Sequence, residues 1–410
     1  MQTNLADWIK DTPEGREADA ILRKCVHCGF CLATCPTYNL LGDELDSPRG
    51  RIYLMKQVLE GAPVTVRTQV HLDRCLTCRA CETTCPSGVQ YGRLVDIGRE
   101  VVEKKVPRGV LQDAYRALLR FAFLSGPLFA FGVKLGRMAR PLLPAALARQ
   151  VPPAREAGGW PAARHARKMI VLDGCVQPTL APDINAATAR VLDRLGISLV
   201  SVPRSGCCGA IEYHLNAQAA GLERMRRQID AWWSHVEAGA EAIVITASGC
   251  GTMVQEYGHL LAGDPAYAAK AARITALARD VGEVVAAEGA ALARLLAGKA
   301  PVDAPVAYHA PCSLQHGLKL KGGVESILRE AGFTLTAVPD SHLCCGSAGT
   351  YSILQPELSG QLLANKVRAL ESGAPTAICT SNIGCPLHIE TGASRPVSHW
   401  IELLDRRLAG

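Results

Sequence analysis

The sequence is poor in aromatic residues, since Phe, Trp and Tyr make up 5% of its 410 positions. Single-stranded nucleic acids are usually bound through aromatic side chains on which the bases stack, so this scarcity argues against a nucleic-acid partner. The net charge of +6 is modest for this length and is unevenly placed. Residues 100–168 contain thirteen Lys and Arg against four Asp and Glu, and the rest of the chain is slightly acidic. The length predicts about two to three domains.

Long hydrophobic runs are also missing, because no apolar run reaches the ~18 residues that a membrane-spanning helix needs. The nearest run covers residues 121–133 and is broken by Ser125, Gly126 and Pro127. The basic residues that flank it are Arg116, Arg120, Lys134, Arg137 and Arg140. This pattern is compatible with a segment on an anionic membrane surface, with a contact to a partner protein, or with a packed helical linker whose basic residues are solvated.

We find no secretory signal peptide, so the 17 cysteines are expected to stay reduced in the cytoplasm and to serve as thiolate ligands. No G-x-G-x-x-G lies between a predicted strand and helix, and no P-loop or G-x-S-x-G is present. A bound dinucleotide and a serine nucleophile of the hydrolase type are therefore not expected in this chain.

What the sequence does contain is one cysteine spacing, C-x2-C-x2-C-x3-C-P, repeated twice near its beginning. The first run consists of Cys25, Cys28, Cys31 and Cys35 before Pro36, and the second of Cys75, Cys78, Cys81 and Cys85 before Pro86. This run is typical of ferredoxins that hold two [4Fe–4S] clusters. A disulfide framework would need a secreted chain, and zinc would be satisfied by paired C-x2-C motifs without the third cysteine and the proline.

In two-cluster ferredoxins the fourth cysteine of each run ligates the other cluster. We therefore assign cluster 1 to Cys25, Cys28, Cys31 and Cys85, and cluster 2 to Cys75, Cys78, Cys81 and Cys35. The two runs are separated by 40 residues (75 − 35), far more than in a compact ferredoxin, and residues 51–60 are apolar at helical spacing. The prediction is a helical ferredoxin domain over residues 1–106, followed by a basic, helical and Pro-rich linker over 107–167.

After residue 168 the pattern changes to alternating strands and helices. Short apolar runs at 169–172, 199–202 and 241–246 predict strands, and residues 184–195 predict a helix ended by Gly196. Landmarks then recur 135 to 137 positions later, among them Cys207-Cys208-Gly209 and Cys344-Cys345-Gly346. The expected fold class is therefore α + α/β: the helical domain, then two pseudo-symmetric α/β lobes with parallel sheets over 168–300 and 301–410.

Each predicted lobe carries four cysteines near strand ends. They are Cys175, Cys207, Cys208 and Cys250 in the first lobe, and Cys312, Cys344, Cys345 and Cys385 in the second. Ligands of open α/β sheets gather at the carboxyl ends of the strands, so each set could converge on one edge. A further iron–sulfur cluster or zinc, in one lobe or in both, is compatible with these residues. Cys379 aligns inside a predicted strand, where we expect it to pack as a small hydrophobic residue.

The pattern C-x31-C-C-G followed by a further cysteine resembles the CCG cysteine-rich domain of heterodisulfide reductases and of iron–sulfur subunits of flavin-dependent dehydrogenases. In the reductase form each motif ends in C-x-x-C and supplies five thiolates to a non-cubane cluster. Both endings have lost one cysteine here, as Ser248-Gly249-Cys250 and Asn382-Ile383-Gly384-Cys385 show. A five-thiolate site is therefore not expected, and a four-thiolate [4Fe–4S] site in one lobe or in both, a zinc site, and an empty site in one lobe all stay open.

The whole arrangement resembles the glycolate oxidase iron–sulfur subunit family, whose plan is shared by the small subunit of glycerol-3-phosphate dehydrogenase and by the lactate-utilisation iron–sulfur protein. The likeness is carried by Asp173-Gly-Cys-Val-Gln-Pro178, Arg204-Ser-Gly-Cys-Cys-Gly-Ala210, Thr246-Ala-Ser-Gly-Cys-Gly251 and Tyr308-His-Ala-Pro-Cys-Ser-Leu-Gln-His-Gly317. It implies a three-subunit enzyme in which an FAD flavoprotein oxidises glycolate to glyoxylate. This chain would pass the electrons to an acceptor, membrane quinone, from a peripheral position on the cytoplasmic face of the inner membrane.

Two other functions remain open on the sequence alone. A heterodisulfide or disulfide reductase would use a CCG cluster for thiol chemistry, although the lost cysteines argue against it. A non-enzymatic metal-binding scaffold would not change its oxidation state when a flavoprotein and substrate are added.

Several other polar residues lie near the cysteines. Four histidines of the second lobe are candidates for hydrogen-bond donors to cluster sulfur or for a quinone or proton site, and equally for ordinary loop residues: His309, His316, His342 and His388. His27 lies within the first run, where it would tune the cluster or act only as a spacer. Arg79 and Arg204 would neutralise reduced clusters or be solvated.

Overall fold

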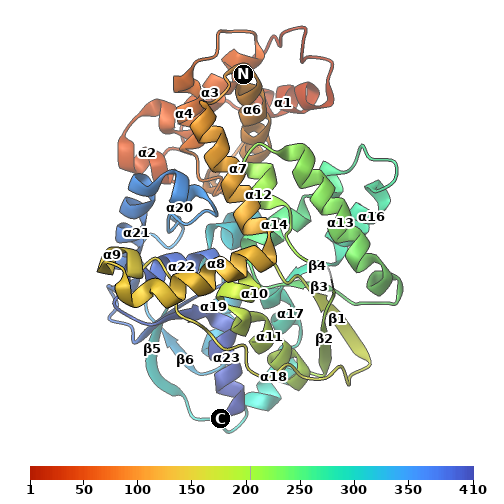
Figure 1. Cartoon of the computed structure of the whole chain (residues 1–410), viewed down its shortest axis with the longest axis vertical. Coiled ribbons are helices and arrows are strands. Elements are labelled where there is room, and N and C mark those ends of the chain that lie inside the picture. Colours follow the sequence, from red (N-terminus) through yellow and green to blue (C-terminus); the bar gives the residue numbers. More distant parts are fainter. Residues whose placement is uncertain (204) are drawn as a thin grey trace.

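The computed structural model describes residues 1–203 and 205–410. It has a helical N-terminal domain, an arm of two helices, and two α/β lobes side by side (Figure 1). The elements of the N-terminal domain are α1 (Pro13–Lys24), α2 (Pro36–Leu41), η1 (Glu44–Asp46), α3 (Pro48–Leu59), α4 (Val66–Asp73), α5 (Ala80–Thr84) and α6 (Tyr91–Lys105). The helical character predicted for this domain is confirmed, and the cysteine runs form the loops and short helices between these elements.

Local sequence signals start the helices of this domain. Thr12, Ser47 and Thr65 precede α1, α3 and α4, and each side chain accepts a hydrogen bond from a backbone N–H of the first turn. Such a cap stabilises a helix by about 1 kcal/mol. Pro36 follows Cys35 at the first position of α2, so the proline of the cysteine run begins a helix. Around α6 the helices bury a core that includes Leu22 and Met55.

The arm consists of α7 (Val110–Leu124) and α8 (Gly126–Ala139), continued by η2 (Arg140–Leu142) and α9 (Ala145–Ala148). None of the residues of α7 or α8 is buried. No single helix among the described residues is long and apolar enough to cross a membrane; α7 and the stretch Gly126–Leu142 meet that criterion only as a pair, bent by 95°. Figure 1 shows α8 lying across the face of the lobes.

The first lobe is built on a parallel sheet of β1 (Arg167–Val171), β2 (Ile197–Ser201), β3 (Ile243–Ile245) and β4 (Ala278–Asp280), in the order β2-β1-β3-β4. Its helices are α10 (Gln177–Leu180), α11 (Pro182–Arg194), α12 (Ala210–His214), α13 (Gln218–Glu237), α14 (Ser248–Gln255), α15 (Tyr257–Leu260), α16 (Ala268–Leu277), α17 (Val281–Ala287) and α18 (Gly289–Leu296). The three predicted strands and the predicted helix of this lobe are confirmed.

The second lobe repeats this plan. Its strands β5 (Val302–His309), β6 (Phe333–Leu335), β7 (Ala377–Thr380) and β8 (Val397–His399) are parallel and follow the order β6-β5-β7-β8. The other elements are the π-helical turn η3 (Ser313–Gly317), α19 (Gly323–Glu330), α20 (Tyr351–Leu354), α21 (Pro356–Glu371), α22 (Gly384–Glu390) and α23 (Trp400–Ala409). The matching strand orders confirm the predicted pseudo-symmetry, and β4 and β8 add a fourth strand that the sequence patterns did not reveal.

The two lobes share one hydrophobic core. The helix after the last strand of each lobe packs on a helix of the other lobe: α23 on α11, and α17 on α19. Ile184, Val285 and Leu328 are fully buried in this shared core with Trp400. Between the same elements, Asp405 accepts hydrogen bonds from Arg190 and forms an ion pair with Arg194 at 2.7 Å. The lobes are therefore held as one body, and the strand ends that carry the cysteines are fixed relative to each other.

Candidate metal centres

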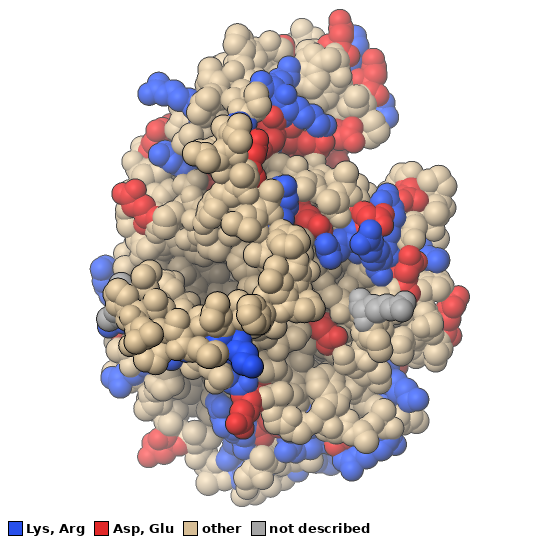
Figure 2. Space-filling model, viewed as in Figure 1, with Lys and Arg blue, Asp and Glu red and all other residues tan. Residues whose placement is uncertain are grey.

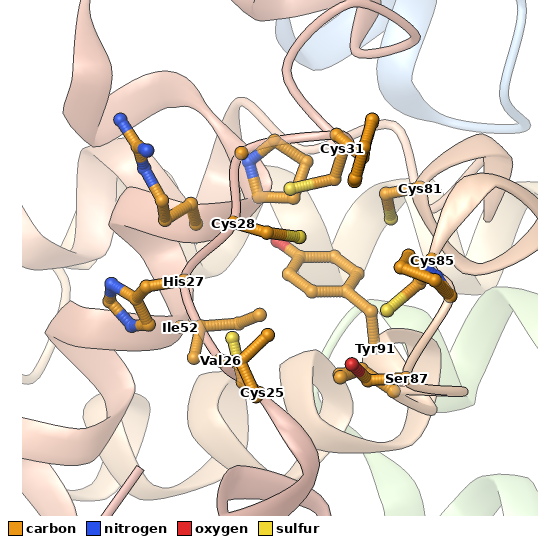
Figure 3. Close-up of a pocket in the computed structure, with 16 residues that line it drawn as sticks. Cys25, Val26, His27, Cys28, Cys31, Ile52, Cys81, Cys85, Ser87 and Tyr91 are labelled. Carbon is orange, nitrogen blue, oxygen red and sulfur yellow. The ribbon is translucent and has the colours of Figure 1, made fainter.

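The thiols of Cys25, Cys28, Cys31 and Cys85 line one cavity, which also includes Cys81 and the ring of Tyr91 (Figure 3). The structure thus brings the last cysteine of the second run to the first three of the first run. Groups of three ligand atoms compact enough for a single ion do occur among the described residues, but they include none of these cysteines. The thiols of this cavity are therefore spaced more widely than the ligands of a single ion. This spacing fits a cubane cluster, because each thiolate binds a different iron there.

The two cysteine runs have the same backbone shape. His27 and Thr77, one residue before the second cysteine of each run, both have positive φ angles, of 56° and 54°. Gly29 and Arg79, one residue after it, follow at 86° and 58°. Left-handed residues on both sides of a cysteine turn the chain sharply, and non-glycine residues adopt this conformation at a cost. Because Thr77 adopts the same conformation as His27, this turn is a property of both loops and does not require a histidine.

The second set of thiols, Cys35, Cys75, Cys78 and Cys81, lies deeper in the molecule. Burial, followed by the neighbouring Cys78, Cys75, Glu82 and Cys35, raises the pKa of the Cys81 thiol well above its usual range. In the first cavity, burial also raises the pKa of Cys31 to about 11. Thiols of this kind are protonated at neutral pH, so metal binding must release their protons.

Tyr91 lies between the two sets. Its ring lines the first cavity, and its hydroxyl donates a hydrogen bond to Cys75 Sγ of the second set at 3.7 Å. One side chain of α6 therefore touches both groups of thiols.

A buried polar network holds Cys35. The Arg51 guanidinium donates to the backbone carbonyl of His71 at 2.7 Å and to Thr37 Oγ1 at 3.0 Å, and lies 4.0 Å from Cys35 Sγ. Asp46 accepts from Arg51 and, at 2.8 Å, from Arg74. The side chains of Arg51 and Asp46 are 1% and 0% exposed. Because a buried guanidinium and carboxylate must be fully paired, this network fixes the loop that carries Cys35.

In the first lobe the thiols of Cys175, Cys207, Cys208 and Cys250 are neighbours in this order, since Cys207 raises the pKa of Cys175, and Cys207 and Cys250 raise that of Cys208. Gly209, the glycine of the Cys-Cys-Gly motif, has a φ of 88°, and its N–H donates to Cys207 Sγ at 3.4 Å. The four predicted thiols are thus together at one edge of the sheet.

The second lobe places its four thiols in the same way. Cys312 and Cys344 lie 3.7 Å apart, and Cys344, Cys345 and Cys385 continue the chain of neighbours. Gly346 matches Gly209 with a φ of 91°, and a Cβ there would lie 2.7 Å from the carbonyl oxygen of Ser359. Only glycine therefore lets the thiol loop approach α21 this closely.

The second set of ferredoxin thiols abuts the thiols of the second lobe. Cys344 belongs to an apolar cluster with Leu76 and Tyr351, and both Cys78 and Cys312 pack against that cluster. Hydrogen bonds flank the junction, from Thr83 to His316 at 3.0 Å and from the Tyr351 hydroxyl to the carbonyl of Arg74 at 3.1 Å. The first lobe contacts the N-terminal domain through ion pairs and through hydrogen bonds such as that from Asn216 to Glu103 at 2.9 Å.

Those ion pairs centre on Glu256, which accepts from Arg79 at 2.8 Å and from Arg93 at 3.3 Å. The Arg79 side chain is thus not solvated, and its charge is paired with that of Glu256 between the two domains. Arg204 lies outside the described residues.

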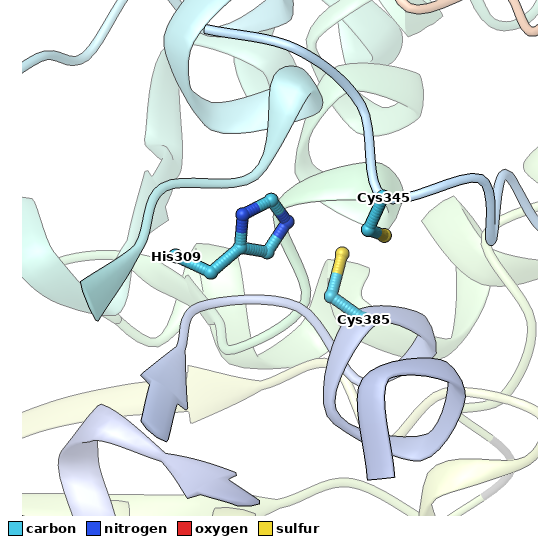
Figure 4. Close-up of side chains that lie close together, drawn as sticks. All are labelled: His309, Cys345 and Cys385. Atoms are coloured by element: carbon cyan, nitrogen blue, oxygen red, sulfur yellow. The ribbon is translucent and has the colours of Figure 1, made fainter. Parts of the chain in front are cut away.

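The remaining histidine and cysteine candidates of the second lobe differ in the groups that they contact. His388 is hydrogen-bonded to Ser359 at 3.1 Å, and His316 lies at the domain junction, where its ring also contacts the carbonyl of His342. His309 is buried against Cys345 and Cys385 (Figure 4). Cys379 is fully buried within β7, as expected for a packing residue.

The comparisons with known proteins agree with this architecture. Residues 21–89 match the 4Fe-4S dicluster domain family, and residues 169–255 and 306–390 match the cysteine-rich (CCG) domain family. The glycolate oxidase iron-sulfur subunit of Escherichia coli (strain K12) is 54% identical over 409 residues, which cover 100% of this chain and 99% of that protein. The chain belongs to the glycolate oxidase iron–sulfur subunit family.

Other members and relatives are more distant. The probable glycolate oxidase iron-sulfur subunit of Bacillus subtilis (strain 168) is 29% identical, with 94% of this chain and 92% of that protein covered. Lactate utilization protein A of Exiguobacterium is 30% identical, but the match covers only 56% of this chain. Two [4Fe–4S] clusters are the cofactors of this family's dicluster domain, and the thiol sets fit them.

Sequence reasoning missed three features of these sites. The Arg51 network was hidden, although an arginine inside the apolar periodicity of residues 51–60 was a usable signal. Nothing in the sequence marked Tyr91 as the contact between the two sets. Asn382, which stands where a C-x-x-C ending has its first cysteine, donates to Cys385 Sγ at 3.5 Å and accepts from the N–H of Gly249 in the other lobe at 3.1 Å.

Proposed function

We propose that this chain is the electron-transferring subunit of a flavin-dependent glycolate dehydrogenase. The observation that carries the proposal is the series of two thiol sets joined by Tyr91, in a chain of this family. A flavoprotein partner containing FAD oxidises glycolate to glyoxylate and releases two electrons and two protons. The clusters, when bound, supply one-electron transfer, and this chain passes the electrons to quinone.

The ligand sets are those that the spacing predicts. Cys25, Cys28, Cys31 and Cys85 hold one [4Fe–4S] cluster, and Cys75, Cys78, Cys81 and Cys35 hold the other. Support comes from the crossed grouping of Cys85 and Cys35 with the opposite runs. The lobe cysteines hold further metal. The chain accordingly divides into residues 1–106 with the two clusters, residues 107–167 with the linker, and residues 168–300 and 301–410 with the two lobes.

The first set is the entry point for electrons from the flavoprotein. Cys28 is exposed, and beside it the apolar side chains of Val26 and Phe30 are 67% and 63% exposed. An apolar rim around a surface-exposed centre suits a protein partner, since exposed hydrophobic patches mark interaction sites. The second set is buried at the junction with the second lobe, so it is the exit.

The arm of α7 and α8 holds the chain peripherally on the cytoplasmic face of the inner membrane. Phe121, Phe131 and Met138 are at least 60% exposed along it, and Figure 2 shows this region largely without charged residues. Most of its basic residues turn inward. Arg116 pairs with Asp73, and Arg137 donates to two backbone carbonyls of the following segment. Apolar insertion rather than charge therefore drives the association.

The function is tested by reducing the anaerobically purified complex of this chain and its flavoprotein with glycolate. EPR should show both clusters reduced, and D-lactate or glycerol 3-phosphate should reduce them far more slowly. Cys85→Ser should remove only the signal of the exposed cluster, and Cys35→Ser only that of the buried one, each with a loss of about four irons. Clusters that stay oxidised with glycolate but are reduced with another substrate would refute the glycolate assignment.

Membrane association is tested by flotation with anionic vesicles. Replacing Phe121, Phe131 and Met138 by Gln should abolish flotation at any salt concentration, whereas Lys134→Gln should leave it nearly unchanged. Val66→Gln, a matched change at a 62% exposed apolar residue outside the arm, is the control. If the arm variant keeps flotation but loses the flavoprotein, the arm is a protein interface and not a membrane anchor.

A further inference from the structure

Tyr91 is the first residue of α6, is 3% exposed, and contacts both sets of ferredoxin thiols in different ways. Its ring lines the cavity of the first set (Figure 3). Its hydroxyl donates a hydrogen bond to Cys75 Sγ of the second set at 3.7 Å. A buried tyrosine hydroxyl usually has a hydrogen-bond partner, and here the partner is a sulfur atom that the proposed ligand sets assign to the buried cluster.

The start of α6 is held against the second cysteine run, which fixes the position of Tyr91. The N–H of Gly92 donates to Glu82 Oε1 at 2.5 Å, and Glu82 follows Cys81 directly in the chain. A Cβ at Gly92 would lie 2.7 Å from Arg79 Nε and 3.0 Å from Glu82 Oε1, so a larger residue would displace two side chains that are already paired. The phenol is therefore placed by the backbone of α6 and not by a flexible loop.

The direction of the hydrogen bond follows from the chemistry of ligation. A thiolate that ligates iron carries no proton and can only accept, so the phenol is the donor. Reduction adds negative charge to a cluster, and hydrogen bonds to charged acceptors are stronger than those to neutral ones. The bond to Cys75 is therefore stronger when the cluster is reduced, and it favours reduction.

Backbone donors do not distinguish the two sets. The N–H of Thr77 donates to Cys75 Sγ at 3.4 Å, and the backbone of His27 makes the corresponding hydrogen bond to Cys25. These two contacts occupy the same place in the two cysteine runs. They therefore affect both clusters alike.

Side-chain donors do distinguish them. Within the described part of the chain, the side chains hydrogen-bonded to ferredoxin-domain sulfur atoms are Tyr91, Thr37 and Arg51, and all three act on the second set. The Thr37 hydroxyl already donates to the carbonyl of Asp46 at 2.9 Å, and Arg51 is 4.0 Å from its sulfur atom. Tyr91 is therefore the uncharged side-chain donor of the buried set.

Burial acts in the opposite direction on the second cluster. Its ligands Cys35 and Cys81 are buried, whereas Cys28 of the first set is exposed. A site with little water stabilises the added negative charge of a reduced cluster less well. Without compensating donors the buried cluster would have the lower potential, and electrons that enter at the first set would move to it less readily.

We propose that Tyr91 selectively raises the reduction potential of the buried cluster, through the hydrogen bond from its hydroxyl to Cys75, and thereby favours electron transfer from the first cluster to the second. The inference rests on the ligand sets of the proposed function. Tyr91 itself is neither oxidised nor deprotonated: the electron passes from one cluster to the other, and the phenol keeps its proton throughout.

The test is Tyr91→Phe, which keeps the ring and removes only the hydroxyl. The full chain is purified anaerobically, its iron is counted, and both clusters are titrated with dithionite and redox mediators while EPR is recorded. The equilibrium constant for reduction of the buried cluster should fall about three- to tenfold, which is about 30–60 mV. The potential of the exposed cluster should not change.

Tyr351→Phe is the matched control. Tyr351 is also a buried tyrosine beside the second set, but its hydroxyl donates to the carbonyl of Arg74 at 3.1 Å and not to sulfur. Its loss should leave both potentials unchanged. Placing 3-fluorotyrosine at position 91 gives the opposite test, because this phenol is a stronger donor of nearly the same size. The potential of the buried cluster should then rise, which a purely structural role of Tyr91 would not produce.

Full iron with unchanged potentials in Tyr91→Phe, or an equal shift of both clusters, would overturn the inference. If Tyr91→Phe does not retain its iron, the fluorinated protein decides, and a potential that does not rise there counts against Tyr91. The proposed function fails in a different way, when the flavoprotein and glycolate leave the clusters oxidised. Because the titration uses dithionite, the two failures are told apart.

Discussion

Arg51 is predicted to set the reduction potential of the buried cluster, and Arg51→Met is the change that tests this. Its guanidinium is 1% exposed and lies 4.0 Å from Cys35 Sγ. A unit charge at that distance contributes about 4 kcal/mol at an effective dielectric constant of 20. For a one-electron couple this corresponds to about 170 mV, since a tenfold change in the equilibrium constant is 59 mV.

The observed shift should be smaller than that limit. The added electron is spread over the whole cluster, and the variant retains Arg74, which pairs with Asp46 at 2.8 Å in the unaltered chain. We therefore expect the potential of one cluster to fall by about 60–120 mV. It falls because reduction adds negative charge, which the missing cation no longer stabilises. The other cluster, in the cavity of Cys25, should not shift.

The assay is an anaerobic potentiometric titration followed by EPR, after iron counting. Iron is counted first because breaking a buried ion pair costs about 3–5 kcal/mol, which is enough to empty the site. Arg51→Lys is the control: it keeps the charge, so its shift should stay below about 30 mV even though the hydrogen-bonding fork is lost. If Arg51→Met keeps its full iron and its potentials agree with the unaltered protein within about 20 mV, the electrostatic reasoning is wrong.

Three further predictions concern the scaffold. Burial raises the pKa of Asp280 from 3.8 to about 7, so the folded protein loses stability as the pH rises through this range. The stability of Asp280→Asn should therefore increase by about 2–3 kcal/mol relative to that of the unaltered chain between pH 5 and pH 8. A difference in thermal shift that does not depend on pH would contradict this. Glu256→Gln leaves Arg79 without this carboxylate and Arg93 with only its ion pair to Glu17 at 3.6 Å, and should weaken the contact of the N-terminal domain with the first lobe by about 2 kcal/mol; hydrogen exchange in α5 and α14 should quicken, and unchanged protection would count against the ion pairs. Cys379→Ala should cost about 1–2 kcal/mol in thermal unfolding and leave metal content unchanged, whereas lost iron would make Cys379 a ligand.

The parts of the fold that follow from local patterns were predictable. The apolar runs at 169–172 and 199–202 became β1 and β2, and the recurrence of Cys-Cys-Gly marked two lobes with the same strand order. Strands β4 and β8 were missed because neither contains an apolar run: Ala278–Asp280 includes two charged side chains, and Val397–His399 includes a serine and a histidine. Strand β3 is equally short, but its three residues are all apolar and lie within the run at 241–246.

What the sequence could not reveal depends on packing between segments far apart in the chain. Arg137 reads as a free surface charge until the structure shows it donating to the carbonyls of Pro152 and Pro153. His309 sits in a recognisable cysteine-rich segment, but only the fold shows that both of its nitrogens are unpaired against two thiols. The cysteine spacing predicted which thiols belong together, while the neighbours that tune them came from elsewhere.

The crossed grouping of cysteines has a consequence for how the subunit is assembled. With the proposed ligand sets, each cluster ties the segment around Cys25 and Cys35 to the segment around Cys75 and Cys85, across a loop that contains α2, η1, α3 and α4. By the chain-entropy relation for cross-links, closing a loop of about 50 residues removes about 4 kcal/mol of freedom from the unfolded chain. Before the clusters are inserted, this domain lacks these cross-links. A chain without iron is therefore expected to be cleaved by proteases in the loop between the two cysteine runs more readily than a chain with both clusters.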